Sequence, residues 1–577
     1  MVHLKINNIP VEVKEGSTIL EAAKVAGINI PTLCYLKEIN EIGACRVCVC
    51  EVKGARSLVA ACVYPVNEGM EVFTNTEKVR KSRKTTLELL LSDHKKECLS
   101  CVRSTNCELQ KLSNEYGCDE NRFQGARSEY EEDNSTSYLV RDNEKCILCR
   151  RCVAVCKKVQ EVAVIAPSRR GFNTHIACAF ESDLNDAPCV ACGQCVAVCP
   201  TGALREREEI DNVREAINDP EKVVVVAAAP AVRAAIGEEF GYPIGTNTEG
   251  KMFTAMRMLG FDKVFDVNFG ADLTIMEEAN ELLHRVKEGG TLPMFTSCSP
   301  GWIRYVEYYY PELIPNLSSC KSPMQMFGAT VKTYWAQKEG IDPKNIYVVG
   351  VMPCTAKKFE KTRENESASG YPDIDAVLTT RELAKMIKTS GILYNELPDG
   401  TFDNPLGEFT GAGVIFGATG GVMEAALRTA AEKLTGKPLD NVEFKQVRGI
   451  KGIKEAEYDL NGTKVKVAVA SGLTNAKELC EKIKKGECDY TFVEVMCCPG
   501  GCVNGGGQPI QSAYTRRQVD LRSKRAKALY GEDKKAKIRK SHENEAVMAL
   551  YKEFFGEPGS HKAHEILHTS YVNRKKR

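Results

Sequence analysis

Long hydrophobic runs and a secretory leader are both absent from this sequence of 577 residues. No run of about eighteen consecutive apolar residues occurs, so an ordinary transmembrane helix is excluded. The N-terminal stretch MVHLKINNIPVEVKEGSTIL contains neither an apolar core nor a small-residue cleavage site. We therefore expect a cytoplasmic protein that makes no membrane contact.

An excess of either charge is also missing, because 78 lysines and arginines balance 77 aspartates and glutamates. A net charge of +1 argues against nucleic acid as a partner, since phosphate binding depends on a basic surface. The basic runs at 533–540 and 573–577 are expected to be solvated surface. The chain is too long for one hydrophobic core, so several domains are expected.

Cysteine, in contrast, is abundant, with 26 residues in the chain. Disulfides are not expected in a reducing cytoplasm, so the thiols are better interpreted as metal ligands. One group has the spacing C-x10-C-x2-C-x13-C, in which a close pair holds one iron and a distant pair closes over a second. Its members are Cys34, Cys45, Cys48 and Cys62. Cys50 falls outside this pattern and is interpreted as a bystander.

The spacing of this first group predicts a [2Fe–2S] cluster, with a structural zinc site as the alternative. Residues 4–27 are predicted to form a β-hairpin followed by a short helix. That order resembles plant-type ferredoxins, although the cysteine spacing is closer to the complex I family. We expect a β-grasp, ferredoxin-like domain at 1–78.

A second group, H-x3-C-x2-C-x5-C, combines one imidazole with three thiolates. Its members are His94, Cys98, Cys101 and Cys107. This donor set suits zinc or a [4Fe–4S] cubane equally well, and its place among other cluster motifs favours the cubane. A neutral imidazole makes such a cluster less negative, so its reduction potential should differ from those of its neighbours.

The most specific pattern is C-x2-C-x2-C-x3-C, which occurs at 146–156 and again at 189–199. In bacterial two-cluster ferredoxins the fourth cysteine of each run ligates the other cluster. We therefore expect two cubanes, one on Cys146, Cys149, Cys152 and Cys199, the other on Cys189, Cys192, Cys195 and Cys156. Lys157 stands where proline often follows the first run, a departure that removes no ligand.

Beyond about residue 210, apolar β-branched runs lead into loops that carry cysteine or proline. Examples are KVVVVAAAP, TLPMFTSCSPGW, NIYVVGVMPC and YTFVEVMCCPGG. Such runs are typical of buried parallel strands, and ligands of open α/β sheets bind outside the carboxyl ends of the strands. Four distant thiols could therefore converge on one buried site: Cys298, Cys354, Cys498 and Cys502.

Three of these segments resemble the signature segments of [FeFe]-hydrogenases. FTSCSPGW, VMPCTAKKFE and EVMCCPGGCVNGGGQP correspond to the family pattern TSCCPGW, MPCxxKxxE and ExMxCPGGCxxGGGQP. The four preceding cluster motifs are similar to the accessory domains of the monomeric clostridial members. The resemblance implies the reversible reaction 2H⁺ + 2e⁻ ⇌ H₂ in a catalytic α/β domain with parallel sheets.

The resemblance also implies an H-cluster, a [4Fe–4S] cubane bridged to a two-iron subsite with carbon monoxide, cyanide and an azadithiolate. Cys354, Cys498 and Cys502 would ligate the cubane, with Cys502 as the bridge. Lys357 would hydrogen-bond a cyanide. The rest of the family's lining would be Pro230, Ala231, Met324, Met352, Pro353, Phe416, Gly417 and Met496. Ala231 and Met324 are apolar where the clostridial members often have serine and glutamine.

The segment TIMEEANELLHR places Glu278, Glu281 and Arg285 on one face of a predicted helix. Taken alone, this pattern would indicate a solvated face with an ion pair. In the hydrogenases, the matching residues form a proton relay from solvent to a thiol. Here that relay would consist of Arg285, Glu281, Ser318, Glu278 and Cys298.

Ser299 occupies a position where the family has a cubane ligand. Iron in such clusters prefers soft thiolate, and a serine hydroxyl loses its proton far less readily. Three outcomes follow: Ser299 ligates through oxygen, Cys497 replaces it where the family usually has alanine, or Cys298 is recruited. Adjacent residues of an extended segment point in opposite directions, which disfavours Cys298.

A multidomain α+β chain with four domains is therefore expected: a [2Fe–2S] domain at 1–78, a small cubane domain with one histidine and three cysteine ligands at 79–127, a two-cubane ferredoxin domain at 128–209 and an H-cluster domain at 210–577. Expected partners are a ferredoxin or flavodoxin and maturation proteins for the two-iron subsite. The alternatives are a hydrogen-sensing or low-activity relative and a complex I-like electron-transfer subunit. His564 and His568 match the HExxH zinc signature, but zinc catalysis is not expected because nothing after them could supply a third ligand and a cleft.

Overall fold

The computed structural model describes residues 1–439, 441–460 and 463–575. The chain divides into two compact units, each assembled from more than one segment. The first unit comprises 1–187, 195–205 and 510–518, and the second comprises 188–194, 206–509 and 519–577. Among the described residues, no helix has the length and apolar character needed to cross a membrane.

Seventeen strands are found among the described residues. Those up to residue 209 are β1 (Val2–Ile6), β2 (Ile9–Val13), β3 (Val49–Val52), β4 (Val59–Ala60), β5 (Glu71–Phe73), β6 (Leu139–Arg141), β7 (Ala166–Ser168), β8 (His175–Ala177) and β9 (Leu204–Glu206). The later strands are β10 (Val223–Ala228), β11 (Lys263–Asp266), β12 (Met294–Phe295), β13 (Ile346–Met352), β14 (Ala376–Thr379), β15 (Ile453–Leu460), β16 (Thr463–Ser471) and β17 (Phe492–Met496).

The α-helices alternate with these strands. Up to residue 209 they are α1 (Ile19–Val25), α2 (Glu77–Ser92), α3 (Glu108–Glu115), α4 (Arg151–Lys158) and α5 (Gln194–Val198). The next are α6 (Ile210–Asn218), α7 (Pro230–Arg233), α8 (Glu249–Met258), α9 (Val267–Glu288), α10 (Pro300–Tyr309), α11 (Pro323–Thr330), α12 (Ala336–Glu339), α13 (Ala356–Glu360) and α14 (Thr380–Thr389). The last are α15 (Gly411–Ile415), α16 (Gly421–Thr435), α17 (Leu473–Lys484), α18 (Ala513–Gln518), α19 (Leu521–Lys535), α20 (Glu545–Leu550) and α21 (His561–Leu567).

The first unit begins with a five-stranded sheet in the order β2-β1-β5-β3-β4. Alternate residues of β1 are buried, which is the pattern of a strand with one face on a core. Thr18 and Glu21 form a capping box at the start of α1. The hairpin and short helix predicted from residues 4–27 are therefore confirmed.

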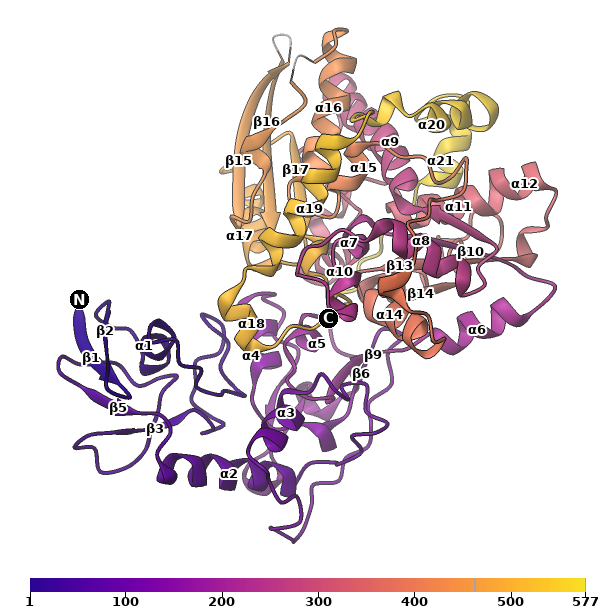
Figure 1. The fold of residues 1–577 in the computed structure, drawn as a ribbon. Helices are drawn as coiled ribbons and strands as arrows, with labels where there is room; N and C mark the ends of the chain where they lie inside the picture. The colour runs from indigo at the N-terminus through magenta and orange to yellow at the C-terminus, as the bar shows by residue number, and fades with distance from the viewer. Residues whose placement is uncertain (440, 461–462, 576–577) are drawn as a thin grey trace. The chain divides into compact units, whose positions relative to one another are not determined.

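The second unit contains two four-stranded sheets, β11-β10-β13-β14 and β12-β17-β16-β15. All neighbouring strands in them run parallel except the long β15–β16 hairpin, drawn in orange in Figure 1. The apolar runs of β10 and β13 are almost wholly buried, as expected for strands covered on both faces. The predicted parallel sheets are confirmed.

The longest helix, α9, crosses the second unit and packs against α11, α15 and α16. Asp266 caps its N-terminus by accepting a hydrogen bond from the amide of Asn268. Most residues up to Ala279 are buried, whereas the last turns reach solvent. This helix therefore connects the interior of the unit with its surface.

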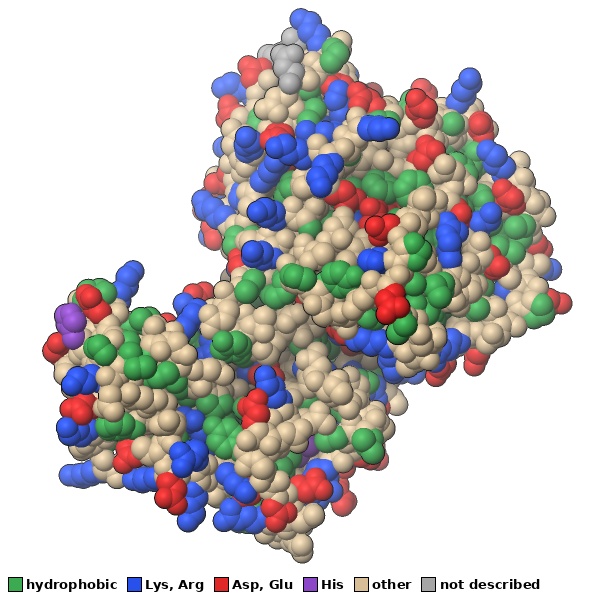
Figure 2. All heavy atoms as spheres, viewed as in Figure 1, with side chains coloured by type: hydrophobic (Ala, Val, Ile, Leu, Met, Phe, Trp, Pro, Cys, Tyr) green, Lys and Arg blue, Asp and Glu red, His purple; other side chains and the backbone are tan. Residues whose placement is uncertain are grey.

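The surface carries acidic and basic side chains intermixed on the face seen in Figure 2. This distribution agrees with a net charge of +1.

Candidate active site

The carboxyl ends of three parallel strands of the second unit lead directly into cysteine loops. β12 precedes Cys298, β13 precedes Cys354, and β17 precedes Cys498. β12 and β17 are direct neighbours in one sheet, whereas β13 belongs to the other. The site is therefore built where the ends of two sheets meet.

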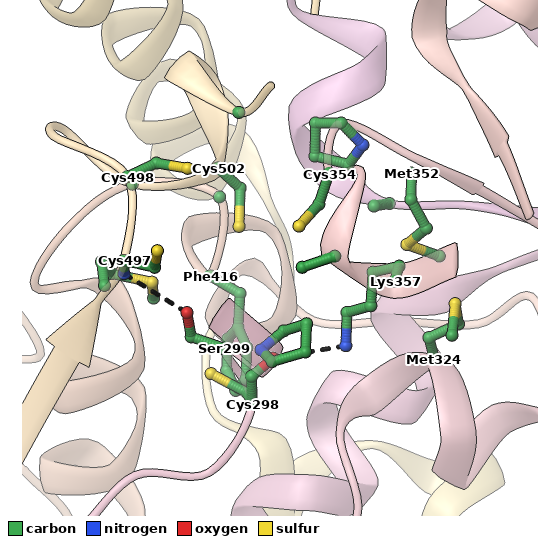
Figure 3. A pocket seen from close by; sticks show the side chains of 18 of the residues that line it. Cys298, Ser299, Met324, Met352, Cys354, Lys357, Phe416, Cys497, Cys498 and Cys502 are labelled. Carbon is green, nitrogen blue, oxygen red and sulfur yellow. Dashed lines mark hydrogen bonds between the residues drawn. The ribbon is translucent and has the colours of Figure 1, made fainter. Parts of the chain in front are cut away.

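These loops surround a cavity whose space between the lining atoms amounts to about 810 Å³. In Figure 3 the thiols of Cys354, Cys498 and Cys502 face the same space. The predicted lining residues that border the cavity are Pro230, Met324, Met352, Pro353, Phe416, Gly417, Met496 and Cys497. The structure thus gathers thiols and apolar side chains from segments far apart in sequence.

Ala231 is the predicted lining residue that the structure places elsewhere. Its methyl group lies in a small core with Val503 and Leu529, behind the cavity wall. Its carbonyl accepts a hydrogen bond of 2.8 Å from the Gln508 side chain. The side chain turns away because α7 begins at Pro230 and directs the next residue into that core.

Two glycines allow the backbone to close tightly around the cavity. Gly501 adopts φ +94°, and a Cβ there would lie 2.7 Å from the amide nitrogen of Thr419. A Cβ on Gly505 would lie 2.1 Å from the carbonyl oxygen of Pro353. A side chain at either position would force the CPGGC loop away from the cavity.

Lys357 lies at the cavity wall with its ammonium group held in place by Glu360. The Nζ donates to the two carboxylate oxygens of Glu360 at 2.8 and 3.0 Å and approaches the carbonyl of Cys298 at 3.3 Å. Glu360 also accepts a hydrogen bond of 2.9 Å from Ser322. Glu360 is the last residue of the family pattern MPCxxKxxE, but no role was predicted for it, although its i+3 spacing from Lys357 on α13 was a usable signal.

Ser299 and Cys497 lie side by side at the cavity. The amide of Cys497 donates to Ser299 Oγ at 3.3 Å (Figure 3). The Cys497 thiol instead contacts the thiols of Cys192 and Cys498, and these contacts together with burial raise its pKa well above the usual value. The hydroxyl and the thiol therefore have different surroundings.

The outer residues of the predicted relay are joined by hydrogen bonds. Arg285 donates to Glu281 Oε1 at 2.6 Å, and Ser318 Oγ donates to Glu281 Oε2 at 2.7 Å. The carboxyl oxygens of Glu278 are buried and form no hydrogen bond with the described residues of this structure, but the carboxyl interacts electrostatically with the thiol of Cys298. Glu278, Glu281 and Arg285 all lie on α9, as the predicted helix requires, and their role in a relay stays a prediction.

Burial sets the proton affinities at the inner end of this chain. The pKa of Glu278 is raised to about 8, chiefly by burial and then by the carboxylate of Glu281. Burial also raises the pKa of the Cys298 thiol well above its usual value. At neutral pH both groups therefore hold their protons and are able to donate them.

In the first unit, the four predicted [2Fe–2S] ligands converge. The Sγ atoms of Cys48 and Cys62 are 3.3 Å apart, and the Cys34 thiol contacts those of Cys45 and Cys62. Cys50 points elsewhere, toward the guanidinium of Arg83 at 3.8 Å. The contacts therefore separate Cys50 from the ligand set.

The first unit also contains two other predicted ligand groups. One combines a histidine with three cysteines, and the other is one of the two ferredoxin groups. Burial lowers the pKa of His94 to about 4, so its imidazole is neutral and able to ligate at physiological pH. A separate cavity of about 400 Å³ is lined by Cys146, Cys149, Cys152 and Cys199. These four residues are the predicted ligand set, including the cysteine that crosses from the second run.

The other predicted cubane set is divided between the two units. Cys156 and Cys195 belong to the first unit, whereas Cys189 and Cys192 belong to the second. This ligand set stays a prediction.

Sequence comparisons identify the family. Residues 222–506 match the "Iron only hydrogenase large subunit, C-terminal domain", and residues 519–574 match the "Iron hydrogenase small subunit". Iron hydrogenase 1 of Clostridium pasteurianum is 48% identical over 98% of this chain and 99% of its own length. The chain belongs to the [FeFe]-hydrogenase family. This hydrogenase also carries regions that match 2Fe-2S, NADH-ubiquinone oxidoreductase-G and 4Fe-4S dicluster domains at 1–77, 83–122 and 145–203.

Two further relatives extend the comparison. A subunit of the NADP-reducing hydrogenase of Solidesulfovibrio fructosivorans, HndD, is 49% identical over 100% of both chains. A solved structure of a variant of apo [FeFe]-hydrogenase HydA1 from Chlamydomonas reinhardtii is 45% identical, with a TM-score of 0.57. That match covers 64% of this hydrogenase and 100% of the algal chain.

The donor set fits the H-cluster of this family with one departure. The thiols of Cys354, Cys498 and Cys502 face a cavity that glycines keep open, and a fixed ammonium group lies at its wall. At the position where the family resemblance predicts the fourth cubane ligand, the cavity is lined by the hydroxyl of Ser299.

Proposed function

We propose that this chain catalyses 2H⁺ + 2e⁻ ⇌ H₂ at an H-cluster held by Cys354, Cys498 and Cys502. The observation that carries this proposal is that one cavity joins these thiols to Lys357 and to the buried chain that starts at Cys298. Four accessory clusters, one [2Fe–2S] and three [4Fe–4S], would exchange electrons with this site.

When bound, the H-cluster supplies the redox chemistry, through a two-iron subsite with carbon monoxide, cyanide and an azadithiolate. The protein holds and moves protons around it. Cys298 donates and accepts a proton at Sγ, and Glu278 exchanges it through Ser318 with Glu281. Lys357 orients an anionic group at the cavity wall, because Glu360 fixes its ammonium. Apolar lining excludes water from the reacting centre.

Ser299 is proposed as the fourth cubane ligand, through Oγ. It occupies the N-cap of α10 but makes no side-chain capping bond, and its hydroxyl instead accepts the amide of Cys497. An amide donor and a helix N-terminus both favour negative charge on that oxygen. Cys497 is a weaker candidate because its thiol contacts Cys192 and Cys498.

The electron partner is proposed to be a ferredoxin or flavodoxin, and maturation proteins would build the two-iron subsite. The support is the series of ferredoxin-type motifs that precede the catalytic domain. The relative from S. fructosivorans is named as a subunit of an NADP-reducing enzyme, so NADPH is the competing donor. Purified chain should evolve hydrogen with reduced ferredoxin and not with NADPH alone.

The deciding experiment is anaerobic maturation followed by hydrogen evolution from reduced methyl viologen, with infrared bands of carbon monoxide and cyanide recorded on the same sample. We expect both bands and turnover. A matched variant, Cys298→Ala, should keep the bands and lose turnover, because only the first proton acceptor is removed. Neither bands nor turnover from protein with intact accessory clusters would contradict the proposal.

A further inference from the structure

The HExxH segment near the C-terminus has no place in the hydrogen chemistry, yet the structure holds it close to the relay. Lys321 N donates to the Leu567 carbonyl at 2.9 Å, and Thr569 N donates to the Ser319 carbonyl at 2.7 Å. These two bonds form an antiparallel bridge that pairs Cys320 with His568. The backbone therefore fixes a thiol and an imidazole next to each other.

A carboxylate from α9 completes this group. A ring nitrogen of His568, the thiol of Cys320 and a carboxylate oxygen of Glu281 all lie within 4.8 Å of one another. The Cys320 Sγ is 3.6 Å from Glu281 Oε2. Ligand atoms around a tetrahedral zinc ion are about 3.3–3.8 Å apart, so shifts of about 1 Å would complete the geometry.

The donor types also select the class of ion. One thiolate, one imidazole and one carboxylate suit Zn²⁺ and similar divalent cations, and they do not suit Mg²⁺ or Ca²⁺, which prefer oxygen. His568 has the outer support usual for a metal ligand, since Nε2 faces Glu277 at 3.1 Å and Nδ1 faces Ser319 at 2.8 Å. The ring nitrogen that binds the ion would lose its contact with Glu277 or Ser319. The other nitrogen would keep its contact and hold the imidazole ring in place.

Charge around the group favours a cation. The carboxylates of Glu277 and Glu281 on α9 act on the buried thiol of Cys320, whereas Glu278 holds its proton at neutral pH. Arg285 approaches this cluster from one side, at Glu281 Oε1. A divalent ion would offset the remaining negative charge and would displace the thiol proton to solvent as it binds.

An approach from solvent lies on the histidine side. His564 is exposed, and its ring stacks on that of His568 with centroids 4.3 Å apart. An ion that arrives from solvent would meet this imidazole one helical turn before the buried donors. His564 or a water molecule would then supply the fourth ligand.

We propose that Glu281, Cys320 and His568 form an inhibitory site for a divalent cation of the zinc class. The bound ion closes the proton route at Glu281, because the same carboxylate accepts from Ser318 and Arg285. This consequence rests on the proposed relay. The binding itself does not, and it is tested separately.

Binding is tested by dialysing matured holoenzyme against limiting Zn²⁺ and recording zinc K-edge X-ray absorption, which is blind to iron. We expect one zinc with a single sulfur at about 2.3 Å and nitrogen or oxygen at about 2.0–2.1 Å. Cys320→Ala should lose this zinc, and Cys488→Ala, a thiol outside every proposed ligand set, should retain it. His568→Gln, which keeps a neutral polar side chain, should lose it as well and serves if Cys320→Ala does not fold.

Three results would overturn the site. A shell of nitrogen and oxygen alone would place the zinc at another group, such as Glu432, His542 and Glu543. Several sulfur ligands would indicate zinc in a damaged cluster. The third is the absence of bound zinc.

The inhibitory effect is measured as hydrogen evolution with and without Zn²⁺, each variant relative to its own metal-free rate. We expect a loss of about 100-fold at saturation, the usual contribution of one positioned proton-transfer group, and almost no loss in Cys320→Ala. Zinc bound with one sulfur but without a loss of rate would overturn the inhibitory role. A metal-free sample with full infrared bands and no turnover would instead refute the proposed function. The X-ray absorption experiment would still decide whether zinc binds at the proposed site.

Discussion

At the residue scale, the proposed ligation by Ser299 would give the catalytic cubane one oxygen ligand in place of a sulfur ligand. Ser299 stands at the start of α10, and the amide of Cys497 reaches its Oγ. Both features favour an anionic oxygen, which a serine otherwise forms with difficulty. The local structure therefore offsets part of the disadvantage of losing a thiolate.

Separate substitutions of Ser299 and Cys497 show which of the two residues is the fourth cubane ligand. Ser299→Ala should lose the catalytic cubane and with it hydrogen evolution, whereas Cys497→Ala should keep both. Ser299→Cys should assemble normally with a shifted cubane potential, because sulfur replaces a harder ligand. The measurements are iron content, electron paramagnetic resonance of the reduced cubane and its redox titration. Cubane loss in Cys497→Ala alone would assign the ligand to Cys497.

A second residue-level prediction concerns Glu278. Its folded pKa is about 8, against about 4.3 for an unperturbed glutamate, so it donates protons below pH 8. We expect hydrogen evolution to fall as pH rises through about 8. Glu278→Gln should remove this dependence of the rate on pH and slow turnover by about 100-fold or more. Glu277→Gln is the control. It should keep the fall of hydrogen evolution with rising pH, because Glu277 faces His568 and Tyr551 instead of the relay.

The same shift affects stability with a defined sign. Because the folded pKa of Glu278 lies above the unfolded value, protonation favours the folded state at low pH. This contribution is fully present below about pH 4 and is lost as pH rises through about 8. Between about pH 4 and pH 8, the thermal midpoint of Glu278→Gln should therefore fall less than that of the unaltered protein.

At the scale of elements, the crossing of α9 and α11 positions the site. A Cβ on Gly270 would lie 2.2 Å from the carbonyl oxygen of Pro323, the first residue of α11. Gly270→Ala should therefore separate the helices, destabilise the protein by about 1–3 kcal/mol and displace Met324 at the cavity wall. The check is the thermal midpoint of the anaerobic holoenzyme, with hydrogen evolution measured alongside.

A matched glycine distinguishes crowding from helix propensity. Gly531 lies on the exposed side of α19, and a Cβ there would meet nothing within 4 Å. Gly531→Ala should stabilise the protein by about 0.5–1 kcal/mol, because alanine loses less backbone entropy. Equal shifts in the two variants would show that the α9–α11 contact adjusts without cost.

Elements also show which parts of the structure could be predicted from sequence. Cysteine spacing and the face formed by Glu278, Glu281 and Arg285 are local patterns. The structure gathers the predicted group at 146–152 and 199 around one cavity and places the three polar residues on α9. The β15–β16 hairpin was not predicted, although Asn-Gly at 461–462 is a hairpin signal in the sequence. The pairing of Cys320 with His568 joins segments 248 residues apart, since 568 − 320 = 248. No local periodicity predicts such a contact, nor the turn of Ala231 into a neighbouring core.

At the scale of the whole molecule, the two units are stabilised in different ways. The second unit has a large apolar core around β10 and β13. The start of the first unit has its own core around β1 and β2. Residues 94–187, by contrast, form short elements, and those at 146–152 surround the cavity of about 400 Å³ that is lined by predicted cluster ligands. Iron–sulfur clusters would therefore supply much of the packing in this stretch.

Removal of iron should reveal this difference. After anaerobic chelation, amide hydrogen exchange should rise most in 94–187, less in β1 and β2, and least in β10 and β13. The reason is that an emptied cavity costs packing energy in proportion to its size, and buried thiols do not replace the lost metal bonds. Mass spectrometry of apo and holo protein measures all three segments in one sample, which serves as its own control. A uniform rise would show one cooperative core, and a rise confined to β10 and β13 would contradict the metal-dependent packing of the first unit.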